Sequence, residues 1–296
     1  MTYTIEVIDI TKKNLEDEIR TLYKEAFNMK ELPAEGHFFK NMNTKASSPS
    51  FFLAAIEDGV IIGCNGFIAI DFFIGDREYT CYQSCHTATH PKHQGRKVFA
   101  NLINYAKEYL KAKGAGFIFG VPNDNSYPIF IKKLAFTETP QLVVRIPNIP
   151  IIKNLFFNRQ SSSLVTQLAG KSLMVREEQV IALKQQENRE PVEVIGINGS
   201  FGWGKIKRVK KFGINFTYFY IGGVYLKNPD DYKRIIKKIF SLFPVSYVQI
   251  VSSASNSSNL MLKKWKKAKM NGFIFFDLNA GVLQHINIMS GIVDVY

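Results

Sequence analysis

The stretch that decides the fold reads Thr87-Ala88-Thr89-His90-Pro91-Lys92-His93-Gln94-Gly95-Arg96-Lys97-Val98-Phe99-Ala100. It joins the end of a strand, a polar loop and the start of a helix. The first turn of a helix presents backbone N–H groups and partial positive charge, which suits a diphosphate. Gly95 permits a tight backbone path, and Arg96 and Lys97 add full charges. These residues predict a phosphate site, although an ordinary polar loop before a helix would also fit them.

The sequence around this stretch predicts alternating strands and helices. Residues 2–10 alternate like a half-buried strand, and Thr11 fits the N-cap of the helix that follows. Asp58-Gly59 is a hairpin signal between two apolar runs. The expected strands are residues 2–10, 51–57, 60–73, 79–89 and 117–121, and later helices are expected over residues 98–111 and 127–134.

The segment His90-Pro91-x-x-Gln94-Gly95-Arg96 resembles the pyrophosphate loop of the GNAT N-acetyltransferase family, whose pattern is Arg/Gln-x-x-Gly-x-Gly/Ala. Gln94 matches the first position of that pattern. Lys97 stands where the first glycine is usual, and Phe99 stands where the second glycine or alanine is usual.

Two downstream segments extend the resemblance. Residues 117–127 resemble the family's next strand and its asparagine-bearing end. Residues 132–136 resemble the closing Lys-x-Gly-Phe, with Ala135 in place of the glycine. The resemblance covers roughly residues 2–140 and implies a GNAT fold, an α/β architecture built on a mixed sheet.

The resemblance also implies acetyl-coenzyme A, or another acyl-coenzyme A, as co-substrate. Its pantetheine arm would lie between two diverging strands, and its diphosphate would lie on the amides that begin the helix. The residues expected to bind it are Thr87, Ala88, Thr89, Gln94, Gly95, Arg96, Lys97, Val98, Phe99, Asn123 and Asn125. Turn formation is the alternative role for the two asparagines.

The catalytic residues are harder to assign. Family members often use a tyrosine to protonate the leaving thiolate, but Ile131 occupies that position here. Tyr127 is the nearest tyrosine and is a candidate acid, or else it packs the helix start. His86 is a candidate base, or a packed histidine. Tyr296 is a third candidate, because some tandem-GNAT enzymes use the C-terminal carboxylate. No grouping of residues has metal-ligand spacing, so we expect no metal.

Composition separates the two halves of the chain. Residues 1–150 carry 17 Lys and Arg against 16 Asp and Glu, whereas residues 151–296 carry 21 against 9. The basic second half favours an anionic partner, or it is simply a solvated face. Three cysteines are too few for a disulfide framework, and neither a secretory signal nor a run of about 18 apolar residues is visible. We expect a cytoplasmic protein without a transmembrane segment.

The order of elements predicts two domains. We assign residues 1–145 to an acyl-coenzyme A binding domain, 146–191 to a partly helical connector, and 192–296 to a second, degenerate GNAT-like α/β domain. The second domain lacks a recognisable Gln-x-x-Gly loop, so we expect it to contribute to acceptor binding instead. Its expected strands are residues 193–197, 216–226, 246–252, 272–278 and 284–295, and its expected helices are residues 229–243 and 259–267.

Three functions remain open at this point. The first is N-acetyl transfer to the amine of a small anionic acceptor, such as a nucleotide-linked amino sugar. The second is aminoacyl or acyl transfer from charged transfer RNA, which the basic half favours and the coenzyme A loop disfavours. The third is a non-catalytic acyl-coenzyme A sensor, which Ile131 and Lys97 favour. The sequence does not indicate the oligomeric state.

Overall fold

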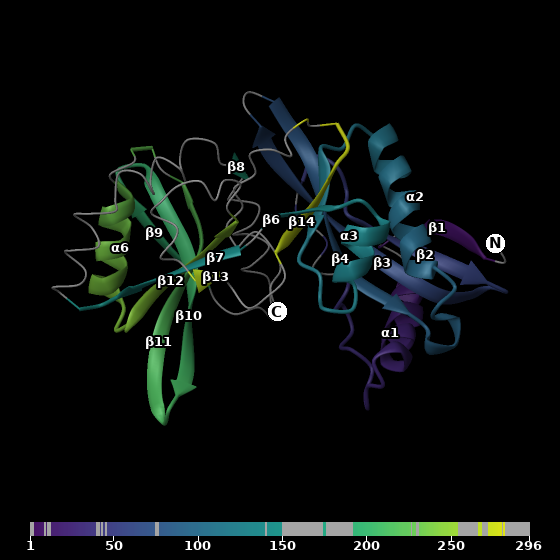
Figure 1. The fold of residues 1–296 in the computed structure, drawn as a ribbon, viewed down its shortest axis with the longest axis horizontal. Helices are drawn as coiled ribbons and strands as arrows, with labels where there is room; N and C mark the ends of the chain where they lie inside the picture. The colour runs from purple at the N-terminus through teal and green to yellow at the C-terminus, as the bar shows by residue number, and fades with distance from the viewer. Residues whose placement is uncertain are drawn as a thin grey trace. The chain divides into compact units, whose positions relative to one another are not determined.

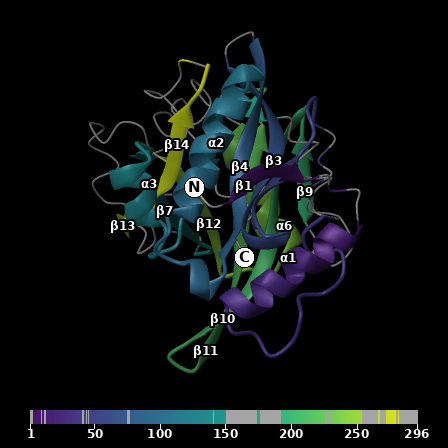
Figure 2. The same cartoon turned by 90° about the vertical axis from the view of Figure 1, so that its right-hand side faces the viewer.

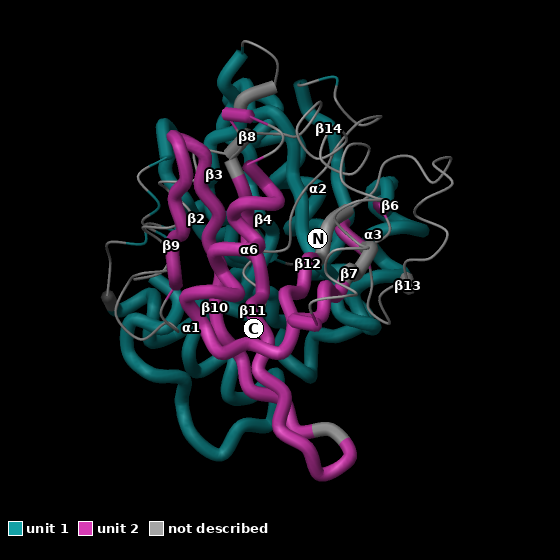
Figure 3. Tube along the Cα trace, turned by 90° about the vertical axis from the view of Figure 1, so that its left-hand side faces the viewer, with its two compact units in different colours: residues 1–138, 274–281 teal, residues 139–273, 282–296 magenta. Residues whose placement is uncertain are grey.

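The computed structural model describes residues 3–8, 10, 13–39, 42, 44, 46–74, 77–139, 141–149, 174–175, 192–225, 227–228, 231–253, 266–267, 272–279 and 281. The chain divides into two compact units, shown in Figures 1 and 3. Residues 1–138 and 274–281 form the first unit, and residues 139–273 and 282–296 form the second.

The first sheet confirms the elements expected around the decisive stretch. Its strands run in the order β1-β2-β3-β4-β5-β14-β6. Their bounds are β1 Thr4–Ile8, β2 Phe51–Glu57, β3 Val60–Ile74, β4 Arg77–Thr89, β5 Phe117–Gly120, β6 Thr137–Thr139 and β14 Phe273–Asp277. The helices are α1 Lys13–Ala26, the 3₁₀ turn η2 Pro91–His93, α2 Val98–Ala112 and α3 Tyr127–Lys133.

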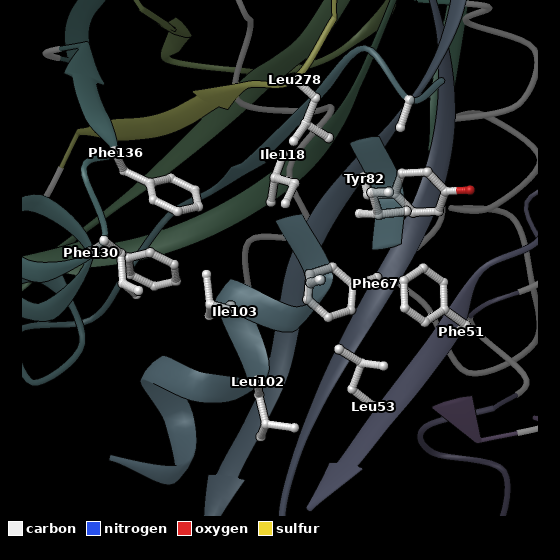
Figure 4. Close-up of a cluster of buried hydrophobic side chains, with 14 of the residues drawn as sticks. Phe51, Leu53, Phe67, Tyr82, Leu102, Ile103, Ile118, Phe130, Phe136 and Leu278 are labelled. Carbon is white, nitrogen blue, oxygen red and sulfur yellow. The ribbon is translucent and has the colours of Figure 1, made fainter. Parts of the chain in front are cut away.

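Helices α1 and α2 cover opposite faces of this sheet, as Figure 2 shows. Side chains alternate between the faces of a strand, so neighbours on β2 belong to different layers. Phe51 and Leu53 lie in the core beneath α2, together with Leu102 and Ile103 of that helix (Figure 4). Phe52, between them, belongs to the other layer, where its ring centroid lies 6.2 Å from that of Phe38. α2 begins within residues 87–100, so that stretch leads onto this face of the sheet.

The second sheet runs in the order β13-β7-β12-β11-β10-β9. Its strands are β7 Gln141–Pro147, β9 Glu193–Ile197, β10 Ser200–Lys211, β11 Ile214–Tyr225, β12 Tyr247–Ser253 and β13 Lys266–Lys267. The two-residue strand β8, Met174–Val175, pairs with β3 of the first sheet. Helix α6, Asp231–Leu242, connects β11 to β12. Its apolar stripe, including Ile235, Ile236 and Ile239, packs on Phe219 and Val248 of the sheet.

Strands β7 and β14 cross between the sheets. β7 follows β6 along the chain, yet it lies between β12 and β13 in the second sheet. β14 follows β13, yet it lies between β5 and β6 in the first sheet and pairs antiparallel with β5 from Ile274↔Gly120 to Asp277↔Phe117. Each sheet is therefore completed by a strand from the other half of the sequence.

Some expectations need correction. The helix expected over residues 259–267 is wrong at its end, because Lys266 and Lys267 form a strand; residues 259–265 lie outside the described residues. The long strand β10 was not expected. Most of the connector 146–191 and the strand 284–295 also lie outside the described part, so the domain boundaries stay a prediction.

None of the helices in the described part of the chain has both the length and the apolar character of a membrane span.

Candidate active site

Strands β4 and β5 begin in parallel and then separate. Their pairing covers Tyr82↔Ile118 and Gln83↔Phe119, where β5 has one residue left. β4 continues for six further residues, to Thr89. Pro122, two residues beyond β5, has no N–H group to extend the ladder. The edge of β4 after Gln83 is therefore no longer covered by β5.

A β-bulge bends β4 at this separation. Cys64 faces Ala88 and Gly66 faces Cys85, so Asn65 stands opposite both His86 and Thr87. His86 has φ of 47°, the left-handed conformation that the first residue of a G1-type bulge adopts.

Asn65 holds the bulge through its side chain. It is fully buried, and its Nδ2 donates to the Ser84 hydroxyl at 3.2 Å while its Oδ1 accepts from the Thr87 hydroxyl. The apolar run around Asn65 predicted a strand but not this function.

Thr89 presents its backbone to the uncovered edge. The His90 N–H donates to the Ile62 carbonyl at 2.9 Å, which turns His90 toward β3. Because backbone groups alternate along a strand, the N–H and C=O of the preceding residue, Thr89, point the other way. Ala88 faces β3 like His90. Among the strand residues expected to bind the cofactor, Thr89 is the best placed for backbone hydrogen bonds.

The start of α2 has the backbone arrangement of a free helix N-terminus. The first intrahelical bond runs from the Asn101 N–H to the Lys97 carbonyl at 2.9 Å, so the N–H groups of the helix's first three residues precede the ladder. Lys97 is the N-cap, has φ of 61°, and supplies no side-chain cap. No acidic residue lies in the first turn. Phe99 packs its ring 5.2 Å from that of Phe130, so this large side chain points into the core and away from the loop.

Glycine lets this helix approach the sheet. A Cβ built on Gly63 of β3 would lie 2.6 Å from Cγ1 of Val98, the first residue of α2. Such a contact requires either side chain to shift, so only glycine fits here without repacking. Gly95, with φ of 80°, instead provides the turn of the loop.

Arg96 fastens the loop to the β2–β3 hairpin. Its guanidinium pairs with both carboxylate oxygens of Glu57, at 2.6 and 2.9 Å, and lies 2.6 Å from Nδ1 of His93. It also lies over the Tyr3 ring, 5.9 Å from the centroid. A phosphate contact by Arg96 stays a prediction, because this side chain already has a bidentate carboxylate partner. Glu57, 39 residues away in sequence, was not expected to take part.

His90 links the same loop to α1. Its Nδ1 accepts the Lys92 N–H at 3.2 Å, and its Nε2 lies 3.0 Å from a carboxylate oxygen of Glu25. Glu57 and Glu25 thus hold the loop from two sides, whereas Gln94 and Gly95 in the middle of the loop are exposed.

Asn123 shapes the turn after β5. Its Oδ1 accepts from the N–H groups of Asn125 and Ser126, at 3.1 and 2.9 Å, and from the Ser126 hydroxyl at 3.0 Å. Its carbonyl accepts the Tyr127 N–H that begins α3, at 2.9 Å. Turn chemistry therefore accounts for its side chain, whereas that of Asn125 is exposed.

The Tyr127 hydroxyl is hydrogen-bonded to a carboxylate. The hydroxyl donates to Glu138 at 2.6 Å, and this bond raises the pKa of Tyr127 above its usual value. Ile131, at the family's tyrosine position, packs against the core. Tyr127 is therefore a protonated donor in this part of the fold.

The other two catalytic candidates differ in their status. His86 is 7% exposed, and its ring lies 5.3 Å from that of Phe38 and 6.2 Å from that of Phe52. Its surroundings are those of a packed histidine within the bulge. Tyr296 lies outside the described residues.

Comparison with known proteins gives the fold a name. The family model described as Acetyltransferase (GNAT) domain matches residues 7–134. No curated protein matches the chain in sequence.

Solved structures resemble the whole chain. A probable N-acyltransferase from Enterococcus faecalis V583 aligns with a TM-score of 0.61 at 12% identity, over 95% of this chain and 74% of that one. A GCN5-related N-acetyltransferase from Anabaena variabilis gives 0.61 and 12%, over 93% and 73%. A putative acetyltransferase from Pyrococcus horikoshii gives 0.52 and 15%, over 99% and 95%.

The α/β fold with two mixed sheets is the expected one, and residues 7–134 of this chain form a domain of the GNAT acetyltransferase family.

Proposed function

We propose that this protein transfers an acetyl group, or another short acyl group, from acyl-coenzyme A to an amine of a small anionic acceptor. The observation that carries the proposal is the edge of β4 that β5 leaves after Gln83, next to a helix start without a side-chain cap. Coenzyme A would supply the acyl group as a thioester. Thr89 would bind its pantetheine arm, and the amides of Val98 and Phe99 would bind its diphosphate.

The second unit is suited to a different role. α6 occupies the place after β11 that α2 occupies after β4, but its first turn contains Asp231, which is 2% exposed and accepts from the Ser200 hydroxyl at 2.8 Å. A buried carboxylate at a helix start repels a diphosphate. We therefore propose one coenzyme A site per chain, in the first unit.

The basic second half supports an anionic acceptor, for which a nucleotide-linked amino sugar is our leading candidate. The acceptor amine must lose a proton to attack, and the departing thiolate must gain one. Tyr127 is our candidate acid, because its hydroxyl carries a proton and it lies at the start of α3, just after β5. In this structure the proton is donated to Glu138, so it must leave that bond to reach the thiolate. We place the reaction in the cytoplasm, where acyl-coenzyme A is available.

Thiol release from acetyl-coenzyme A tests the proposal, with nucleotide-linked amino sugars and free amino sugars as acceptors. Charged transfer RNA is tested separately as a donor, by loss of its aminoacyl group to the same acceptors without thiol release. Tyr127→Phe should lower kcat by about 10²-fold or more while leaving coenzyme A affinity unchanged. Tyr105→Phe, on the exposed side of α2, is the matched control. Calorimetry with coenzyme A separates the alternatives: binding without turnover of any amine would favour a sensor, and absence of binding would refute the proposal.

A further inference from the structure

The hairpin of β10 and β11 extends beyond its own sheet, as Figures 1 and 3 show. β9 pairs with β10 from Ser200 to Gly204, and β12 pairs with β11 from Tyr218 to Ile221. The part near the turn, residues 208–216, is thus a two-stranded ribbon with no third strand among the described residues. A ribbon of this kind adds little to the stability of a sheet.

The tip of this ribbon carries an unusual residue. Phe212 and Gly213 have φ of 50° and 78°, as a two-residue type I′ turn requires. Asn, Asp and Gly suit the first position of such a turn, and a bulky aromatic there is strained. The chain uses Asp58-Gly59 and Asn198-Gly199 at two other turns with the same signs of φ. Phe212 is therefore a poor choice for folding alone.

Phe212 is also fully exposed, with a relative accessibility of 101%. Ile214 beside it is 59% exposed. Exposed apolar residues gathered at one tip indicate a binding surface more than isolated ones do. We call residues 205–215 the basic hairpin.

Charge surrounds this apolar tip. Residues 205–211 contain five cations, namely Lys205, Lys207, Arg208, Lys210 and Lys211, and residues 194–229 contain no Asp or Glu. Arg208 and Lys210 are exposed along the ribbon. The tip of the hairpin is apolar and the cations lie farther along its strands. This order matches an anionic bilayer, in which headgroup charge lies outside the acyl chains.

We propose that the basic hairpin docks the protein on an anionic lipid surface, with Phe212 and Ile214 entering the interfacial layer and Arg208 and Lys210 contacting the headgroups. Nucleic acid fits less well. Single strands are bound in basic grooves whose aromatic rings form a stacking platform, whereas this ring stands at a projecting tip. The proposal does not depend on the acyl transfer proposed above.

Flotation of the full chain with vesicles tests the docking. Binding is expected with phosphatidylcholine mixed with phosphatidylglycerol, and not with phosphatidylcholine alone. Phe212→Asn should weaken binding about tenfold or more, because the buried ring is lost. The same variant should unfold at a higher temperature, because Asn-Gly suits the turn. A purely structural role for Phe212 predicts no loss of binding.

Two matched controls accompany this variant. Leu242→Asn removes a side chain that is 55% exposed at the end of α6, and it should bind like the wild type. Arg208→Gln with Lys210→Gln should weaken binding, whereas Lys233→Gln with Lys237→Gln on α6 should not, at equal net charge.

Three results would overturn the docking. The first is equal lipid binding by Phe212→Asn and the wild type. The second is transfer RNA binding that depends on Phe212 without any vesicle binding, which would assign the hairpin to nucleic acid. The third is self-association that Phe212→Asn abolishes in the absence of lipid.

Discussion

Left-handed residues explain two places where this chain departs from its family's pattern. Lys97 has φ of 61° and Ala135 has φ of 52°, and both stand where the pattern has glycine. L-residues tolerate this conformation poorly because Cβ approaches the carbonyl oxygen. The family's glycine therefore reflects backbone geometry, and this chain keeps the geometry at a cost in stability.

Lys97→Gly should therefore stabilise the protein by about 1 kcal/mol, because glycine adopts the left-handed conformation without that contact. Affinity for coenzyme A should stay within a few-fold of the wild type, since the amides of α2 keep their positions. Urea unfolding and calorimetry measure the two quantities. Lys92→Gly, in the 3₁₀ turn, is the control and should destabilise. A destabilised Lys97→Gly would show that the lysine side chain holds the loop.

Residue identity in the loop was predictable, whereas residue partners were not. Gly95 and the start of the helix at Val98 follow from local signals. The carboxylate that pairs with Arg96 belongs to Glu57, on another strand, and only the tertiary fold brings the two together at 2.6 Å. For Asn123 the sequence left two roles open, because asparagine suits both a turn and a ligand contact, and its side chain forms the turn.

At the scale of elements, long apolar or amphipathic runs were predicted well and charged ones poorly. α2 and the β2–β3 hairpin appear where their periodicity and Asp58-Gly59 place them. β10 was missed because Lys205–Lys211 carries charge on both faces of the strand, which removes the alternation. The bulge at His86 was also unpredictable, because it depends on the register between β3 and β4.

Lys107 joins α2 to the end of α3 from within the core. It is 8% exposed, its Nζ donates to the Leu134 carbonyl at 2.6 Å, and it lies 3.9 Å from the Phe276 ring centroid. Desolvation lowers the pKa of Lys107 to about 8, while Glu108 opposes the shift.

This lowered pKa predicts how stability depends on pH. Below about pH 8, Lys107 is protonated in both the folded and the unfolded chain, so its contribution is constant. Above that value the unfolded chain still binds the proton and the folded chain does not, so stability rises with pH until the unfolded lysine titrates. The difference in unfolding free energy between wild type and Lys107→Met should therefore grow in favour of the wild type from pH 8 to 10. A difference that stays flat in urea titrations would show that the amine remains charged.

At the scale of the whole chain, the two sheets repeat one plan. Each has a parallel strand pair joined through a helix, β4-α2-β5 and β11-α6-β12, and a bulge on the first strand of that pair. In the second sheet the bulge falls at Gly222, where a Cβ would lie 2.1 Å from the Trp203 ring. The order of elements suggested this duplication, but it did not predict that β7 and β14 are exchanged.

The exchange predicts that neither half of the chain folds well alone. A fragment of residues 1–148 lacks β14, whose Ile274 and Phe275 are at most 1% exposed, and it leaves the edge of β5 open. We expect this fragment to aggregate and the full chain to unfold in one cooperative transition.

Fusing residues 272–281 behind residue 139 through a Gly/Ser linker should restore a soluble first unit, because the strand between β5 and β6 is replaced. The matched control is the same fusion with Ile274→Asp and Phe275→Asp, which keeps the length and removes the apolar strand. Circular dichroism and denaturant melts of the three fragments measure the outcome. A cooperative melt of residues 1–148 alone would show that the first sheet is stable without β14. The exchanged strands would then not couple the folding of the two units.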